Sequence, residues 1–289
     1  MSILVTGANG TIGSLVVQGL AAAGADVKTL VRKQGKLPFP AGVIEVVGDM
    51  TDVASMRSAL ASVRTLFLLN AVTPDEVTQA LIALNLAREA GIERIVYLSV
   101  IHADQYVNVP HFTGKHTVER MIDSLDIPAT ILRPAYFMQN DLSVRQVIEG
   151  HGVYPMPIGS AGVAMIDTRD IADLAVAELL RRDRAAKPLA RVTLDLVGPQ
   201  ALTGASVAQA WSDALGRSTG YGGDDVAAFE KQMASFAPSW MAFDMRLMMS
   251  GIQTVGMRGS DGAVDRLQEI LGRPLRSYAD FVREATIRG

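Results

Sequence analysis

The chain has 289 residues, of which 49% are apolar and 20% charged, and its formal net charge is −3. A chain of this length can bury a substantial core. It has no cluster of basic residues of the kind that binds nucleic acid or a membrane surface, so neither is an expected partner. It has no cysteine, which excludes disulfides, thiolate chemistry and most structural zinc sites. No apolar segment could span a bilayer and no charged leader precedes the first apolar run, so we expect a cytoplasmic protein with no membrane partner.

An apolar run at residues 2–6 leads into three spaced glycines and then into a segment with helical spacing of apolar residues. A strand, a glycine turn and a helix form the unit that cradles the pyrophosphate of a dinucleotide. The first glycine permits the tight turn, the second lets the backbone approach the phosphates, and the third lets the helix lie against the strand. The alternative is a glycine-rich turn with no ligand. We predict cofactor contacts at Gly7, Asn9, Gly10, Thr11, Ile12 and Gly13.

The residue that reads the adenosine ribose follows the second strand, about twenty positions after the glycines. Arg32 and Lys33 occupy this place. An acidic residue would accept hydrogen bonds from the 2′-hydroxyl of NAD, whereas a guanidinium suits the 2′-phosphate of NADP. We therefore expect NADP(H) to be preferred over NAD(H). A solvated basic loop is the alternative, because Lys28 and Lys36 lie nearby.

Apolar runs at 27–31, 43–47, 66–70, 94–99 and 129–132 alternate with helical patterns, as in an α/β fold with a doubly wound parallel sheet. Ligands of such sheets lie outside the carboxyl ends of the strands. The sequence thus places Asp49, Asn70 and Ser99 on one rim with the glycine turn and Arg32.

From about residue 141 short extended pieces alternate irregularly with helices. We expect residues 1–140, with returning segments near 163–182 and 190–198, to form a Rossmann-type NADP-binding domain. Residues 141–289 would form a smaller, mainly helical lobe that binds substrate and closes over the cofactor.

Several motifs occur in an order typical of one family: the glycine turn, Gly48-Asp49, Leu132-Arg133-Pro134 with Phe137-Met138 and Asn140, residues 166–172, and residues 271–274. By these motifs the chain resembles the NmrA-like branch of the atypical short-chain dehydrogenases/reductases. The resemblance implies either an NADP-binding redox sensor or a reductase of quinones, azo dyes or related compounds.

The resemblance also implies site residues. Asp49 and Met50 would lie by the adenine, Asn70 and Ala71 would approach the ribose, and the loop from Pro134 to Phe137 would border the nicotinamide.

Standard members of the wider family use Tyr-x-x-x-Lys on a helix, because this spacing puts both side chains on one face and the ammonium assists the phenol. Here the motif reads His111-Phe112-Thr113-Gly114-Lys115. Lys115 is predicted to anchor the nicotinamide ribose. His111 is either a proton donor, since imidazole titrates near neutrality, or a capping or surface group. Standard members also carry a serine near the end of the fifth strand. Either Ser99 or Val100 matches that position, so the role of Ser99 is open.

This departure has a chemical consequence. Carbonyl reduction leaves an alkoxide that needs a firm acid, whereas hydride addition to a quinone, azo bond or conjugated cation leaves a delocalised product. A weakened acid therefore favours an NADPH-dependent oxidoreductase acting on a small hydrophobic, conjugated acceptor. The alternative is an NADP(H)-sensing regulatory protein without turnover.

Other features have two interpretations. Tyr106 and Tyr136 would flank the nicotinamide pocket. Either one supplies a phenol in place of the missing motif tyrosine, or both are packing aromatics. A stripe at Met241, Met245, Met248, Met249 and Ile252 would line a plastic substrate pocket or belong to the core or a dimer contact. We predict substrate contacts at Tyr136, Met138, Met241 and Met245. The four histidines lack metal-ligand spacing, so we expect no metal site; the protein would be a monomer or a homodimer.

Overall fold

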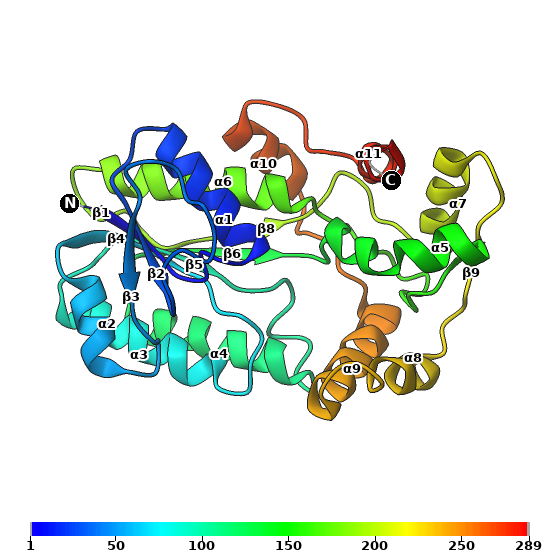
Figure 1. Ribbon diagram of the computed structural model, residues 1–289, viewed down its shortest axis with the longest axis horizontal. Helices are drawn as coiled ribbons and strands as arrows, with labels where there is room; N and C mark the ends of the chain where they lie inside the picture. The colour runs from blue at the N-terminus through cyan, green and yellow to red at the C-terminus, as the bar shows by residue number, and fades with distance from the viewer. Residues whose placement is uncertain (1, 288–289) are drawn as a thin grey trace. The chain divides into compact units, whose positions relative to one another are not determined.

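The computed structural model describes residues 2–287 and is built around a seven-stranded sheet (Figure 1). The strand order is β3-β2-β1-β4-β5-β6-β8, and every neighbouring pair from β3 to β6 is parallel. This order confirms the predicted doubly wound α/β fold, with the reversal of winding between β1 and β4. The strands are β1 (Ser2–Val5), β2 (Val27–Val31), β3 (Ile44–Val47), β4 (Val63–Leu68), β5 (Ile95–Leu98), β6 (Ala129–Pro134) and β8 (Val192–Leu196).

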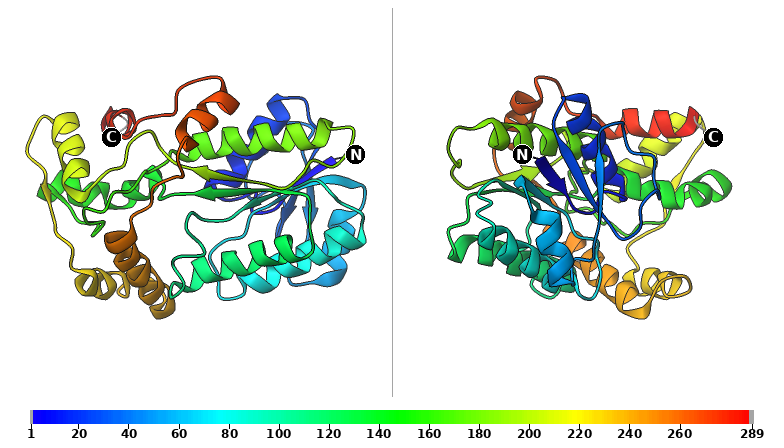
Figure 2. Two further views of the ribbon diagram at one scale, coloured as in Figure 1. Left: turned by 180° about the vertical axis from the view of Figure 1, so that it is seen from behind. Right: turned by 60° about the vertical axis from the view of Figure 1, so that its left-hand side comes forward.

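Helices cover both faces of the sheet. Helices α1 (Thr11–Ala22) and α6 (Thr168–Arg184) lie on one face (Figures 1 and 2). Helices α2 (Val53–Leu60), α3 (Glu76–Glu89) and α4 (Pro110–Ser124) lie on the other face. None of the helices described between residues 2 and 287 is long and apolar enough to cross a membrane.

The central strands are buried because their side chains are apolar on both faces. Leu66, Phe67 and Leu68 of β4 are completely buried, as expected for a parallel strand with helices on either side. Residues of β1, β4 and β5 pack with α2, α3 and α4 into one hydrophobic cluster. Each fully buried aliphatic or aromatic side chain of this kind contributes about 1.5–3 kcal/mol to folding. The rigid sheet therefore fixes the loops that follow its strands.

Arg182 of α6 is completely buried and holds the segment that leads into β8. Its Nε donates to the Thr130 hydroxyl at 2.6 Å, and its terminal nitrogens donate to the carbonyls of Leu189 and Ala190 at 3.0 and 2.9 Å. Burial lowers the pKa of this guanidinium to about 10. The buried charge is tolerated because its donors are satisfied by oxygen acceptors.

The chain forms two compact units. The first contains residues up to Val100, Gly114–Arg133 and Arg169–Leu194, and the second contains Ile101–Thr113, Pro134–Thr168 and residues from Asp195 onward. The second unit includes η1 (Met138–Val144), α5 (Arg145–His151), β7 (Val153–Tyr154), α7 (Gly204–Leu215), β9 (Gly220–Tyr221), α8 (Val226–Met233), α9 (Ser239–Val255), α10 (Ala263–Leu271) and α11 (Tyr278–Ile287).

A carboxyl group lies at the centre of the second unit. Asp141 is completely buried and accepts hydrogen bonds from the hydroxyls of Tyr278 at 2.5 Å and Tyr154 at 3.2 Å. Trp211 Nε1 donates in turn to the Tyr278 hydroxyl at 3.0 Å. Burial raises the pKa of Asp141 to about 7, although both tyrosine hydroxyls oppose the shift. The network therefore joins η1, β7, α7 and α11 through a carboxyl group that titrates near neutrality.

Candidate active site

The turn after β1 is shaped by glycines that lie close to other backbone atoms. Gly7 has a φ of +63°, in the left-handed region, and a Cβ on it would lie 2.8 Å from Leu69 Cγ. A Cβ on Gly13 would lie 2.2 Å from the Gly7 carbonyl oxygen, so α1 packs directly on the turn. A Cβ on Gly10 would meet only that same oxygen, at 3.3 Å. Gly7 and Gly13 therefore serve packing, while Gly10 leaves the outer surface of the turn open.

The first turn of α1 has no side-chain cap. Gly10 is the N-cap residue in an extended conformation, and the first helical bond runs from the Ser14 N–H to its carbonyl at 3.0 Å. The N–H groups of Thr11, Ile12 and Gly13 precede this bond, so they have no acceptor inside the helix. Such a helix end suits an anionic phosphate group.

Three buried polar atoms lie at the carboxyl ends of neighbouring strands. Within residues 2–287, Asn9 Oδ1, Asn70 Oδ1 and Ser99 Oγ are buried and make no hydrogen bond. They follow β1, β4 and β5, which are adjacent in the sheet. A buried polar atom without a partner costs about 1–3 kcal/mol, so these atoms suit a ligand that carries hydroxyl or amino groups. Together with the open helix end, they fit a dinucleotide.

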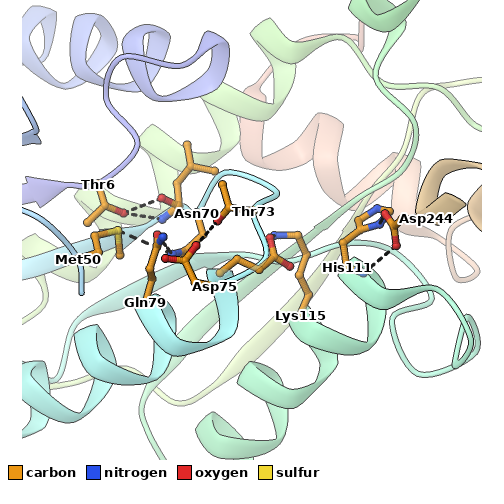
Figure 3. Close-up of polar contacts among 11 residues, drawn as sticks. Thr6, Met50, Asn70, Thr73, Asp75, Gln79, His111, Lys115 and Asp244 are labelled. Atoms are coloured by element: carbon orange, nitrogen blue, oxygen red, sulfur yellow. Dashed lines mark hydrogen bonds and ion pairs between the residues drawn. The ribbon is translucent and has the colours of Figure 1, made fainter. Parts of the chain in front are cut away.

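Thr6 connects the loop after β4 to the glycine turn. Its buried hydroxyl donates to the Leu69 carbonyl at 2.9 Å and accepts from the Leu69 N–H at 2.8 Å. The next residue, Asn70, is thereby held beside the turn, where its Nδ2 donates to Gln79 at 3.4 Å and contacts Met50 Sδ at 3.7 Å (Figure 3). The structure thus brings together Met50 and Asn70, predicted to face the adenine and the ribose, and leaves the following Ala71 exposed.

The predicted nucleotide-selecting residues lie at the end of β2. Arg32 and Lys33 are both exposed. Asp49 accepts hydrogen bonds from the Thr51 hydroxyl at 2.6 Å and the Thr51 N–H at 2.8 Å. These two bonds, followed by the charge of Arg32, hold the pKa of Asp49 below its usual range. Arg32 is therefore near the residue predicted to lie by the adenine, and its guanidinium is accessible to a phosphate.

Lys115 on α4 is buried and faces Glu76 at the start of α3. The distance from Lys115 Nζ to Glu76 Oε2 is 4.0 Å, and Lys115 is only 8% exposed. Burial lowers the pKa of Lys115, while the carboxylates of Glu76 and Glu119 raise it. Glu119 is itself gripped by Arg133, with contacts of 3.0 and 2.5 Å. Burial is the larger effect, so the pKa of Lys115 lies below its usual value, and the two carboxylates limit the shift.

The start of α3 explains why Glu76 points inward. The sequence Thr73-Pro74-Asp75-Glu76 predicts a capping box in which Glu76 would bond back to Thr73, and this prediction is wrong. The helix begins at Glu76, because the Thr73 hydroxyl donates to Asp75 at 2.8 Å and the Glu76 N–H donates to the Thr73 carbonyl at 3.2 Å. The Glu76 side chain is then directed to Lys115 rather than to the backbone.

His111 occupies the tyrosine position of the motif and belongs to the second unit. Its ring is 9% exposed, so the prediction of a surface group is wrong. The ring Nδ1 bonds to Asp244 Oδ2, and the His111 N–H donates to Asp244 Oδ1 at 3.2 Å (Figure 3). The ring also packs edge-on against Phe112. Across residues 2–287 no group of three His, Cys, Asp or Glu side chains is arranged to hold a metal ion.

The tyrosines near the motif are engaged in packing. The Tyr106 hydroxyl donates to the Gly256 carbonyl at 2.7 Å, and its ring stacks on Phe112. Tyr136 is buried, and burial raises its pKa well above the usual value. Tyr97 of β5 is likewise buried with a raised pKa. Burial thus makes the phenols of Tyr97 and Tyr136 weaker acids than an exposed tyrosine, and the Tyr106 hydroxyl is already bonded to Gly256.

The segment after β6 leads into the second unit. Pro134 ends the strand, and Phe137 forms a bridge with Ile166. Met138 is 1% exposed and lies in the core of the unit.

Helix α9 divides the methionine stripe into two parts. Met248, Met249 and Ile252 are buried in the core, whereas Met241 and Met245 are only half-buried. The core interpretation holds for the second half of the stripe. Met241 and Met245 retain exposed surface.

Sequence reasoning missed Glu76 and Asp244. Asp244 had one available signal, because it falls between Met241 and Met248 on the apolar face, where an acidic residue is unexpected. Glu76 gave no such signal, since a glutamate in the first turn of a helix is common.

The chain matches the NmrA-like family over residues 1–267. It is 32% identical over 290 residues to an NAD(P)H azoreductase of Xenophilus azovorans, covering 97% of this chain and 96% of the relative. It is also 32% identical over 287 residues to a (4-alkanoyl-5-oxo-2,5-dihydrofuran-3-yl)methyl phosphate reductase of Streptomyces griseus, covering 98% and 97%. The structure is similar to that of the Escherichia coli NADPH-dependent quinone oxidoreductase QOR2 in complex with NADPH, with a TM-score of 0.86, 23% identity and coverage of 98% and 99%.

These matches cover nearly the whole chain, and the structural match agrees with the Rossmann-type strand order of the sheet. The chain therefore belongs to the NmrA-like family, as an NAD(P)H-dependent oxidoreductase of the atypical short-chain dehydrogenase/reductase type.

Proposed function

We propose that this protein uses NADPH, in preference to NADH, to reduce small hydrophobic acceptors with conjugated, electron-poor bonds, such as azo compounds and quinones. The observation that carries the proposal is His111 in place of a tyrosine four residues before Lys115. The phenols of Tyr97, Tyr106 and Tyr136 are buried, and burial raises their pKa values. An acceptor that delocalises the incoming charge suits such a site better than a simple ketone.

The preference for NADPH rests on Arg32 and Lys33. Both are exposed at the end of β2, and no acidic residue stands in their place. A guanidinium can bind a 2′-phosphate through two parallel hydrogen bonds.

The remaining residues have distinct roles in this proposal. The glycine turn and the first N–H groups of α1 bind the pyrophosphate, and Asn9, Asn70 and Ser99 supply buried oxygens to the rest of the cofactor. Lys115 binds the ribose hydroxyls next to the nicotinamide, and His111 supplies a proton where the product needs one. When bound, the reduced nicotinamide supplies a hydride and its two electrons. Pro134 and Phe137 complete the proposed nicotinamide contacts, and the half-buried Met241 and Met245 complete the proposed substrate contacts. Tyr136 and Met138, which the sequence also predicts as substrate contacts, are buried in this structure.

Two relatives support the choice of acceptor. One is an NAD(P)H azoreductase and the other reduces a dihydrofuranone phosphate, and each spans nearly the whole chain. Both relatives are reductases, and the first is an azoreductase.

The test is NADPH oxidation by the purified protein with an azo dye, a quinone, a triarylmethyl cation dye and a simple aliphatic ketone. We expect turnover with the conjugated acceptors, little with the ketone, and slower turnover when NADH replaces NADPH. Tight NADPH binding with no oxidation on any acceptor would contradict the proposal and favour a redox sensor.

A further inference from the structure

We infer that Asp244 is a positioning residue that fixes the tautomer of His111, so that proton delivery takes place at Nε2. This inference rests on the proposed function, because it assigns the source of the proton in the same reaction. Asp244 lies on α9, 133 residues from His111 along the chain.

The first step is the burial of Asp244. Its side chain is 1% exposed, and an ionised carboxylate with so little access to water requires strong donors. His111 supplies two of them, because its N–H donates to Oδ1 and its ring Nδ1 bonds to Oδ2. One residue thus contacts both oxygens of the carboxylate, which fixes the ring and the start of α4 together.

The second step is the position of the ring proton. An ionised carboxylate can only accept hydrogen bonds, so the bond to Asp244 requires a proton on Nδ1. Protonated on both nitrogens, His111 donates from Nδ1 to Asp244 and presents a second N–H at Nε2. When it gives up that proton, the neutral ring keeps Nδ1–H and can be reprotonated from solvent only at Nε2. The carboxylate acts through the imidazole and does not itself transfer a proton.

The third step is the location of His111. It lies four residues before Lys115 on the same helix, α4, at the place where related enzymes carry their acid. The ring is flanked by Phe112, which is completely buried and restricts its rotation. The motif contains His111 but not the carboxylate that holds its ring. Asp244 supplies that carboxylate from α9.

The pair matters only for acceptors that need a proton. An azo group that receives a hydride loses its N=N π bond, and the second nitrogen is left with an electron pair and a negative charge. That nitrogen takes one proton, which gives a hydrazo product. A triarylmethyl cation that receives a hydride at its central carbon becomes a neutral triarylmethane and takes no proton. The inference thus predicts that Asp244 controls azo reduction and not reduction of the dye cation.

The decisive variant is Asp244→Asn. If the single amide oxygen keeps the His111 N–H, the amide NH2 faces Nδ1, so Nδ1 becomes an acceptor and the proton moves to Nε2. Ring ¹⁵N shifts of the histidines in the NADP-bound protein, recorded over a pH series, should show Nδ1–H in the neutral wild-type ring and Nε2–H in the variant. The His111→Gln variant assigns the signal.

Kinetics provide the second readout. At a fixed pH, Asp244→Asn should lower kcat for the azo dye by about 10- to 100-fold, up to the lower limit of the roughly 10²–10⁴-fold effect of a general acid, because the variant misplaces the acid without removing it. It should change kcat for the dye cation less than about twofold. In a His111→Gln background the same substitution should have little further effect on azo reduction. The matched control is Glu230→Gln. Glu230 on α8 forms an ion pair with Arg246 on α9, and removing its charge should leave both rates unchanged.

The outcomes separate the two proposals. Equal losses with both acceptors, or additive losses in the double variant, would overturn the role of Asp244 and leave the reductase intact. If Asp244→Asn fails to fold, two other measurements still test the inference. It is overturned if the neutral His111 ring of the wild type carries its proton on Nε2. It is also overturned if His111→Gln loses the same fraction of kcat with the azo dye and with the dye cation; in both cases the proposed reductase function stands. If no acceptor is reduced by the wild type, the proposed function fails, and the ¹⁵N shifts still test the tautomer.

Discussion

Gly13 packs so closely on Gly7 that a Cβ on the first would lie 2.2 Å from the carbonyl oxygen of the second. The turn after β1 and the start of α1 are therefore one rigid piece. The glycine spacing has two physical functions, which substitutions can separate.

Gly13→Ala should destabilise the fold, because the clash is with backbone that cannot move aside. We expect a loss of about 3 kcal/mol in the free energy of unfolding, measured in urea.

Gly10→Ala should change the free energy of unfolding by less than about 1 kcal/mol, since its φ of −87° suits alanine. It should nevertheless weaken NADPH binding at least about tenfold by calorimetry, because a methyl group would cover the open face of the turn. Gly150→Ala, with free space around its Cβ position inside α5, is the control: it should gain about 0.5–1 kcal/mol of stability, as alanine does in a helix, and leave NADPH binding unchanged.

Arg32→Gln should weaken NADPH binding by about 10- to 100-fold, since charge-assisted contacts to a phosphate contribute about 1.5–3 kcal/mol. NADH binding should change little, because NADH lacks the 2′-phosphate. Calorimetric titration with both cofactors measures the difference. Lys36→Gln removes an equal charge from the same exposed loop and should affect neither cofactor. Equal losses for NADPH and NADH in Arg32→Gln would show that the arginine is structural.

Glu76→Gln should shift the pH dependence of cofactor binding. Burial lowers the pKa of Lys115 and the Glu76 carboxylate opposes this, so removing that carboxylate lowers the pKa further. A lysine is charged below its pKa, and its affinity for ribose oxygens is lost as the pH rises through that value. The alkaline loss of NADPH affinity should therefore begin at a lower pH in Glu76→Gln than in the wild type.

Fluorescence titration of NADPH across the alkaline range measures this shift. The control is Glu89→Gln, which breaks an exposed ion pair with Arg57 and should leave the curve in place. Superimposable curves for Glu76→Gln and the wild type would remove Lys115 from the cofactor site.

Asp141 should make the second unit less stable as the pH rises. Its pKa is raised to about 7 in the folded protein, against about 3.9 in an unfolded chain. Between these values the folded state holds a proton that the unfolded state has lost, so stability falls by about 1.4 kcal/mol per pH unit and levels off above about pH 7. An asparagine cannot titrate, so Asp141→Asn should remove this part of the pH dependence. The difference in free energy of unfolding, variant minus wild type, should therefore be more positive at pH 8 than at pH 5.

Thermal unfolding at a series of pH values checks this expectation. The exposed Asp104→Asn should give the wild-type profile. Parallel profiles for Asp141→Asn and the wild type would show that the buried carboxyl does not titrate in this range.

Local patterns predicted the sheet and its glycine turn. Strands such as β4 are apolar on both faces, and the glycine spacing is set by contacts within a few residues, apart from the approach of Leu69 to Gly7. The position of Lys115 also followed from a local motif on one helix. These features are visible in a sequence because their physical causes lie within one strand, turn or helix.

The partners of the site residues could not be predicted in this way. Glu76 reaches Lys115 because Thr73 bonds to Asp75 and α3 starts later than its capping residues suggest. Asp244 meets His111 across 133 residues, and periodicity assigns its helix only an apolar stripe. Both pairings depend on how distant helices pack, which neither motif spacing nor composition specifies.

The grip of Arg182 on Leu189 and Ala190 involves main-chain carbonyls only. A guanidinium that binds the peptide backbone recognises the course of a loop and is indifferent to the side chains it carries. Relatives could therefore diverge freely in the residues that precede β8 while keeping the same path, provided that the arginine and the hydroxyl of Thr130 stay in place.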